Sequence, residues 1–222
     1  MIKNYKADLQ IFRVFSQNEL NRQLPGKSNI DDLIDRYFKD FFNYFEKNPS
    51  PEIDNGRYIS GLLCSFFRTY YITLEHIEYS ELVEASVLLR KQIELLSRLY
   101  EIANEERSVE KLLGKTPNIK TLFSSLKHHY GDYSEIAHSA SPEPFVLLGI
   151  AQDNDKRSFK IYPEYQEDQR TAYQHLLMTF VEFFCWNLSF LKKNQIAVPS
   201  CMQQRTFNLI IKFINEDLGE KR

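Results

Sequence analysis

The stretch SELVEASVLLRKQIELLSRLYEIANE, residues 80–105, decides the fold. It is the longest uninterrupted helical pattern in the chain, and no proline falls between residues 52 and 116. At 100° per residue its apolar side chains cover roughly half of the helix circumference, which is wider than the apolar stripe of an ordinary surface helix. The pattern therefore predicts a central helix that neighbours pack against on more than one side. The apolar positions are Leu88, Leu89, Ile93, Leu95, Leu96, Leu99, Tyr100, Ile102 and Ala103.

Polar residues occupy the opposite arc of this helix. They are Arg90, Lys91, Glu94, Ser97, Arg98 and Glu101. Arg90 and Glu94 are four residues apart and are therefore neighbours on the helix surface. One interpretation is a solvated face with weak ion pairs. The alternative is that Arg90 and Glu94 face a cleft, where the guanidinium could hold an anion through two parallel hydrogen bonds. Gln92 lies within the apolar arc, and it needs hydrogen-bond partners if it is buried there.

Length and composition indicate one domain with an ordinary core. The chain has 222 residues, of which 43% are hydrophobic, and its 17 Phe and 13 Tyr suit packing between helices. A net charge of −2 does not indicate a broad surface for nucleic acid. Three cysteines without a CxxC pair favour reduced thiols, and hence a cytoplasmic location.

A membrane location is not predicted. The first residues lack the apolar run of a signal peptide. The most hydrophobic stretch, residues 176–191, is short for a membrane span and contains Glu182 and Asn187, so a buried core helix fits it better.

Prolines and glycines divide the rest of the chain into further predicted elements. Helices are expected over residues 6–23, 30–47, 55–78, 119–129, 165–193 and 201–218. A break is expected near Gly131, followed by a short turn or helix over 132–139. Residues 145–151 form a short apolar run and residues 158–162 alternate between apolar and polar, which predicts a β-hairpin with its turn at 153–155.

These elements define the expected architecture. The fold class is mainly all-α, an up-down helical bundle with a small β-hairpin near residues 145–162. Residues 1–222 form a single domain, with the core bundle over 55–195 and an N-terminal helical appendage over 1–50.

The segment HHYGDYSEIAHSASPEP, residues 128–144, holds three of the five histidines. Together with Arg90 and Glu94 it resembles uncharacterised bacterial helical proteins. In those proteins an Arg-x-x-x-Glu helix is followed by a Tyr-x-x-Ser-x-x-x-His segment and a small hairpin. The matching residues in the segment are Tyr130 or Tyr133, then Ser134 and His138. The likeness covers roughly residues 55–195, and it implies a fold without an assigned activity.

The end of the same segment also resembles a feature of HEPN-type helical proteins. In that superfamily an Arg precedes a His near a helix end by four to six intervening residues, and dimers use the pair to cut RNA without a metal. Here the positions for that Arg hold Gly131, Asp132 and Tyr133. The hypothesis of a HEPN-like nuclease therefore takes Arg90 of the other helix as the phosphate clamp, His138 as the acid or base and Glu94 as an orienting partner.

A literal Arg-x4-His match lies elsewhere, at Arg170 and His175. With 12 arginines and five histidines in the chain, about one match to any of the three permitted spacings, four to six intervening residues, is expected by chance. The simpler interpretation is therefore that these residues form the polar first turns of a helix.

Glu135 and His138 form a Glu-x-x-His pair, of which di-iron carboxylate bundles use two. One pair is a weak metal signal, and neither a metal nor a cofactor is predicted. Three functions therefore compete. The first is a regulatory or interaction protein, for example in stress or phage defence, with homodimers as one form. The second is a HEPN-like ribonuclease, or a relative that binds RNA or nucleotide. The third is a metal-dependent bundle enzyme.

Overall fold

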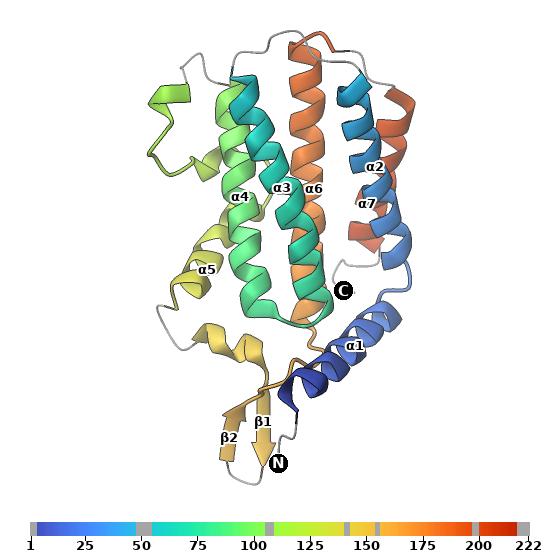
Figure 1. The fold of residues 1–222 in the computed structure, drawn as a ribbon, viewed down its shortest axis with the longest axis vertical. Helices are drawn as coiled ribbons and strands as arrows, with labels where there is room; N and C mark the ends of the chain where they lie inside the picture. Colours follow the sequence, from blue (N-terminus) through green and yellow to red (C-terminus); the bar gives the residue numbers. More distant parts are fainter. Residues whose placement is uncertain are drawn as a thin grey trace.

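The computed structural model describes residues 4–47, 55–104, 109–139, 143–153, 156–196 and 200–216. Within these ranges the chain is mainly α-helical, which confirms the predicted fold class (Figure 1). The helices are α1 (Tyr5–Gln23), α2 (Lys27–Lys47), α3 (Gly56–Glu78), α4 (Leu82–Asn104), α5 (Leu126–His138), α6 (Asp168–Lys193) and α7 (Ser200–Glu216). Short 3-10 helices are η1 (Val109–Lys111), η2 (Ile119–Thr121) and η3 (Glu143–Leu148), and the strands are β1 (Ile150–Asp153) and β2 (Lys156–Phe159).

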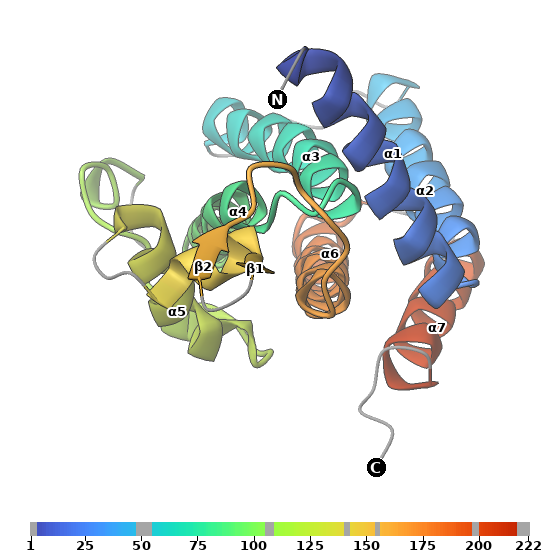
Figure 2. The same cartoon turned by 90° about the horizontal axis from the view of Figure 1, so that it is seen from below.

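Helix α4 is the central helix that the sequence predicts. It packs against α3, α5 and α6. Figure 2, which views the bundle from one end, shows α4 with α5 on one side and α3 and α6 on the other. Leu89, Ile93 and Leu96 are completely buried. Gln92 is buried as well and finds both of its partners: its amide nitrogen donates to the Thr73 hydroxyl, and its amide oxygen accepts from Thr179 at 2.6 Å.

The polar arc of α4 is not solvated along its whole length, so that prediction is wrong for its last turns. Ser97, Arg98 and Glu101 are buried. The segment after η1 covers them, since Arg98 donates to the carbonyl of Lys115 at 2.5 Å and Glu101 accepts from the backbone N–H of Asn118 at 2.8 Å. Arg98 and Glu101 also pair with each other at 2.8 Å, which provides the opposite charge that a buried ion requires.

Helices α1 and α2 pack into the same hydrophobic core as α3, α4 and α6, so they do not form a separate appendage. Leu20 and Leu24, at the end of α1, and Phe38 in α2 belong to one buried cluster with α3, α4 and α6. Phe38 meets Phe67 and Phe180 at ring-centroid distances of 4.6 and 5.4 Å. Edge-to-face and tilted contacts of this kind add to the energy of apolar burial. The core therefore extends well beyond residues 55–195.

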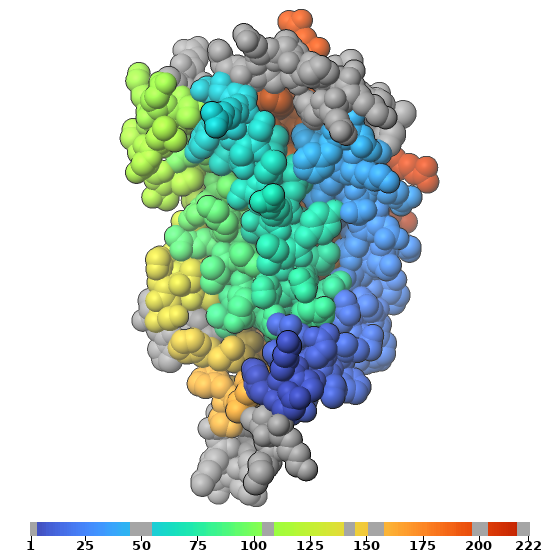
Figure 3. All heavy atoms as spheres, in the orientation of Figure 1, coloured from blue at the N-terminus to red at the C-terminus, as the bar shows by residue number. Residues whose placement is uncertain are grey.

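Helix α1 crosses one end of the bundle (Figures 1 and 3). Arg13 donates to Glu81 at 2.7 Å, and Gln17 donates to Glu78 at 2.8 Å. The ring of Phe12 stacks on Tyr162 at 4.7 Å. Polar ties and one aromatic contact therefore hold α1 against the end of α3 and the segment that follows the hairpin.

The predicted break near Gly131 is wrong, because α5 continues from Leu126 to His138. Glycine inside a helix costs only about 1 kcal/mol relative to alanine, and the packing of α5 on α4 and α6 outweighs this. The helix ends at Ser139, whose φ of 47° lies in the left-handed region.

The hairpin is present but shorter than predicted. β1 and β2 pair antiparallel, with Ile150 opposite Phe159 and Asp153 opposite Lys156. Residues 145–148, which the sequence assigns to the first strand, belong to the 3-10 helix η3. The predicted turn at 153–155 includes residues 154 and 155, which lie outside the described residues.

Among the helices in these ranges, none has an apolar stretch sufficient to cross a membrane. Helix α6, which contains the hydrophobic stretch 176–191, buries Glu182 and Asn187 inside the bundle, as the sequence predicts for a core helix.

Candidate functional site

Helices α4 and α5 bring four polar residues together, and we call Arg90, Glu94, Tyr130 and His138 the Arg90 cluster. The guanidinium of Arg90 lies at its centre. Its Nη2 is 3.2 Å from Oε1 of Glu94 and 3.4 Å from the hydroxyl of Tyr130. Its Nη1 is 3.5 Å from Nε2 of His138. The Tyr130 hydroxyl donates to Oε1 of Glu94 at 2.8 Å, which closes the network.

Helical spacing explains why these side chains converge. Arg90 and Glu94 are one turn apart on α4, and Tyr130, Ser134 and His138 follow one another by single turns on α5. The packing of α5 against α4 then places the two rows face to face. Arg90 and His138 are 48 residues apart in the chain, so only the tertiary fold brings them together.

The Arg90 cluster lies at the surface, and only part of the guanidinium is open to solvent. The side chains of Arg90 and Glu94 are each 22% exposed, His138 is exposed and Tyr130 is half-buried. The Nε of Arg90 is buried and has no hydrogen-bond partner within the described residues. A ligand from solvent would therefore reach the guanidinium at its Nη groups, next to His138.

The protonation states in the Arg90 cluster follow from its contacts. The hydrogen bond that Arg90 donates to the Tyr130 hydroxyl is the largest cause of the raised pKa of Arg90, which therefore stays a cation. Burial is the largest cause of the raised pKa of Tyr130; the hydrogen bond to Arg90 opposes this rise and the one to Glu94 adds to it. Tyr130 therefore stays a neutral phenol at neutral pH and can donate to the Glu94 carboxylate.

This arrangement has the parts that anion binding and proton transfer require. Arg90 provides a permanent positive charge with donors in a plane, and Tyr130 provides a neutral hydroxyl. His138 provides an imidazole, the side chain that most often acts as a general acid or base in enzymes. An arginine beside a histidine can stabilise charge on a phosphate while the histidine moves a proton.

Other predicted site residues lie elsewhere. Tyr133 is buried between α5 and α6, where its hydroxyl bonds to Nδ1 of His175, so the structure does not bring it to the Arg90 cluster. The His175 ring also lies 4.2 Å from that of His129. Arg170 is partly exposed in the first turn of α6, and Ser134 is half-buried on α5 between Tyr130 and His138.

The metal alternative gains no ligands from the structure. Glu135 is exposed on α5, one turn before the end of the helix. Within the ranges that the structure describes, no three His, Cys, Asp or Glu side chains are grouped so that they could hold a metal ion. The pair of Glu135 and His138 therefore stands without a third ligand in that part of the chain.

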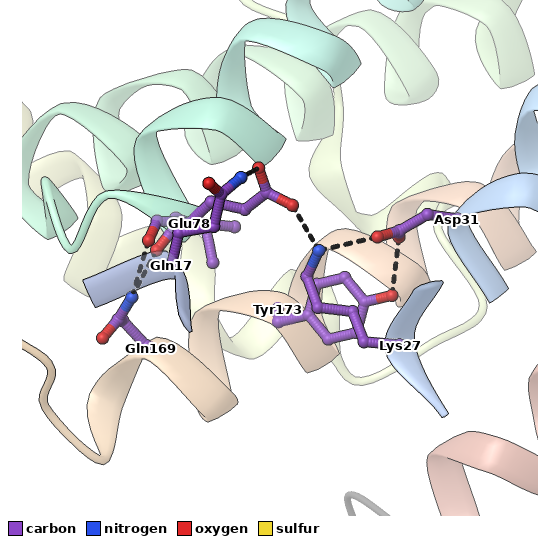
Figure 4. Close-up of polar contacts among 7 residues, drawn as sticks. Gln17, Lys27, Asp31, Glu78, Gln169 and Tyr173 are labelled. Carbon is purple, nitrogen blue, oxygen red and sulfur yellow. Dashed lines mark hydrogen bonds and ion pairs between the residues drawn. The ribbon is translucent and has the colours of Figure 1, made fainter. Parts of the chain in front are cut away.

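A second polar cluster, around Lys27, was not predicted from the sequence. Lys27, at the start of α2, has a side chain only 2% exposed and pairs with Asp31 at 2.7 Å and with Glu78 (Figure 4). Tyr173 of α6 donates to Asp31 at 2.7 Å, and Gln17 of α1 donates to Glu78. Burial is the largest cause of the raised pKa of Asp31. The only advance signal was the i, i+4 spacing of Lys27 and Asp31, which is common on exposed helices.

Comparisons with protein-family models, with curated proteins and with solved structures found no match to this chain. The fold and the Arg90 cluster define the class as far as it is shown: a mainly α-helical bundle with an arginine, tyrosine, glutamate and histidine gathered where α4 meets α5. Function is inferred below from that geometry.

Proposed function

We propose that this chain binds RNA or a nucleotide and holds a phosphate of its ligand between Arg90 and His138. One observation carries the proposal. Nη1 of Arg90 and Nε2 of His138 come within 3.5 Å of each other at a partly exposed position, although they lie on different helices.

The geometry suits a phosphate because the N–H groups of arginine can only donate hydrogen bonds, and phosphate oxygens accept them. In the free protein, Nε2 of His138 faces Nη1 of Arg90 and therefore accepts from it. A phosphate oxygen placed between the two groups accepts from Arg90, and it accepts from His138 as well when the imidazole carries a proton there. Arginine suits this role because its planar donors match the oxygens of a phosphate.

Cleavage of bound RNA without a metal is the activity that this site would support. Neutral His138 would take the proton of a ribose 2′-hydroxyl, whose oxygen then attacks the adjacent phosphorus and forms a 2′,3′-cyclic phosphate. The bond from phosphorus to the 5′-oxygen of the next nucleotide breaks, and that oxygen takes a proton from water. Arg90 would stabilise the charge that builds up on the phosphate oxygens. This is the activity that the HEPN resemblance implies, with Arg90 supplied by α4.

Binding to a fluorescein-labelled single-stranded RNA tests the proposal. Fluorescence polarisation in the presence of EDTA gives the Kd, and gel electrophoresis of the same samples follows cleavage. Arg90→Gln should weaken binding by about ten-fold or more, because hydrogen bonds to charged groups contribute about 1.5–3 kcal/mol. Arg205→Gln is the matched control, since Arg205 is exposed on α7, across the bundle from α5 (Figure 1). Equal affinity of Arg90→Gln and the unmodified protein would contradict the proposal.

A role in protein interaction, as a cytoplasmic regulatory protein that forms homodimers, is the second candidate. It is favoured by α1, where Ile11, Val14 and Phe15 are exposed on one face and Phe15 is 67% exposed. Sedimentation equilibrium tests it: the unmodified chain should form dimers that Phe15→Ser weakens. A monomer at all concentrations would contradict the homodimer.

A further inference from the structure

Glu94 occupies the part of Arg90 that a ligand would use. Its Oε1 lies 3.2 Å from Nη2 of Arg90. Because Nε of Arg90 is buried, the two Nη groups are the donors within reach of solvent, and Glu94 already engages one of them. A carboxylate carries the same sign of charge as a phosphate and accepts the same hydrogen bonds.

We propose that Glu94 is an internal competitor for the anion-binding donors of Arg90: a ligand phosphate that accepts from both Nη groups meets His138 at Nη1 and must replace the Glu94 carboxylate at Nη2. This inference rests on the proposed function of the Arg90 cluster. It makes Glu94 a residue that sets affinity and selectivity, and it differs from an orienting role, in which loss of Glu94 would weaken binding.

Tyr130 would allow a phosphate to replace the Glu94 carboxylate without a wider rearrangement of the Arg90 cluster. Its hydroxyl lies 3.4 Å from Nη2 of Arg90 and donates to Glu94 at 2.8 Å. Its ring lies beneath the guanidinium, with Cζ of Arg90 5.5 Å from the ring centroid. When the carboxylate leaves Arg90, the tyrosine ring still supports the guanidinium through a cation–π contact, and the rest of the cluster keeps its shape.

The competition also selects among ligands. When a ligand with a single carboxylate replaces Glu94, the interaction free energy that it gains with Arg90 only equals the one that Glu94 loses. A phosphate has further oxygens that engage His138 at the same time, so its gain exceeds the loss. The Arg90 cluster should therefore prefer phosphate groups to simple carboxylates, which suits the nucleotide class of ligand.

The test measures the Kd of the same labelled single-stranded RNA for two variants that change the net charge equally. Glu94→Gln removes the competing charge and should tighten binding by about five-fold, the change in an equilibrium constant that a partly exposed ion pair produces. Glu84→Gln, exposed in the first turn of α4, is the matched control and should change the Kd by less than about two-fold.

Each outcome has one meaning. Tighter binding by Glu94→Gln alone supports the competitor. Unchanged or weaker binding overturns it, and so does an equal gain in Glu84→Gln, which would reflect net charge. If Arg90→Gln loses binding in these cases, the proposed function stands while this inference fails. Circular dichroism establishes that the variants are folded, and Glu94→Ala provides a second variant that removes the carboxylate and should also tighten binding.

Discussion

The buried histidine of α6 predicts a specific dependence of stability on pH. The side chain of His175 is only 9% exposed, and its Nδ1 forms a hydrogen bond with the hydroxyl of Tyr133, which is a neutral group and not a carboxylate. Burial is the main reason that the pKa of His175 falls from 6.5 to about 4, and the neighbouring His129 ring, 4.2 Å away, adds to the effect. In the folded protein this imidazole is therefore neutral down to about pH 4.

The sign and size of the effect follow from proton linkage. Between about pH 6.5 and 4 the unfolded chain binds a proton at His175 that the folded chain does not, so the free energy of unfolding falls as the pH falls. A pKa difference of about 2.5 corresponds to about 3 kcal/mol, which is fully lost only below the folded pKa. At neutral pH the group contributes no such penalty.

The assay is urea unfolding, followed by circular dichroism, at several values between pH 7 and pH 4. The informative quantity is the free energy of unfolding of the unmodified protein minus that of His175→Gln, which should fall by about 3 kcal/mol over this range. Taking the difference removes opposite contributions from His76, whose pKa the bond to Glu81 raises, and from Asp31 and Glu182, whose pKa values burial raises.

The control for this assay is His128→Gln, which changes an exposed histidine on α5. Its difference from the unmodified protein should stay nearly constant over the same pH range. A constant difference for His175→Gln would refute the reasoning, because it would mean that the folded protein accommodates the charged imidazole.

Two further predictions concern the packing of the bundle. Leu96→Ala should lower the free energy of unfolding by about 2–5 kcal/mol, because Leu96 is completely buried in α4, whereas Lys91→Ala on the exposed side of the same helix should change it by less than about 0.5 kcal/mol. Near-equal denaturation curves for these two variants would show that α4 is misplaced. Lys27→Met should cost about 3–5 kcal/mol, because two carboxylates lose their cation in a largely buried site, and Lys212→Met, which removes an exposed ion pair within α7, should cost less than about 1 kcal/mol. Thermal and urea unfolding of both lysine variants would check this, and equal losses would contradict it.

The sequence predicted the helices well where a single apolar face decides them. The arc of Leu89, Ile93 and Leu96 identified α4 as central, and Gln92 as a residue in need of buried partners. The same wheel misplaced Arg98, because a helical wheel cannot show which later segment folds over a polar face. Here the segment around Lys115 does so through a backbone carbonyl, and no side-chain pattern encodes such a partner.

The candidate site was predictable only in its local part. Arg90 and Glu94 are helix neighbours by spacing alone. The choice between Tyr130 and Tyr133 depended on whether the helix continues through Gly131. Since it does, Tyr130 lies two turns before His138 and faces α4, whereas Tyr133 points into the interface with α6. A break at the glycine would have left the two tyrosines without a fixed rotational relation to the histidine.

The Arg90 cluster and the polar cluster around Lys27 differ mainly in how deeply their cations are buried. Both combine a cation, a tyrosine and acidic side chains. Lys27 is almost completely buried between two carboxylates, so its charge is neutralised within the fold and cannot meet a ligand (Figure 4). Arg90 has one carboxylate, 22% of its side chain is exposed, and its remaining Nη group faces the exposed imidazole of His138. An incoming anion can replace a single carboxylate at the surface at little cost, whereas removing Lys27 would leave two carboxylates without their cation in a largely buried site. This difference in burial is the physical reason why we propose ligand binding at the contact of α4 and α5 and not at Lys27.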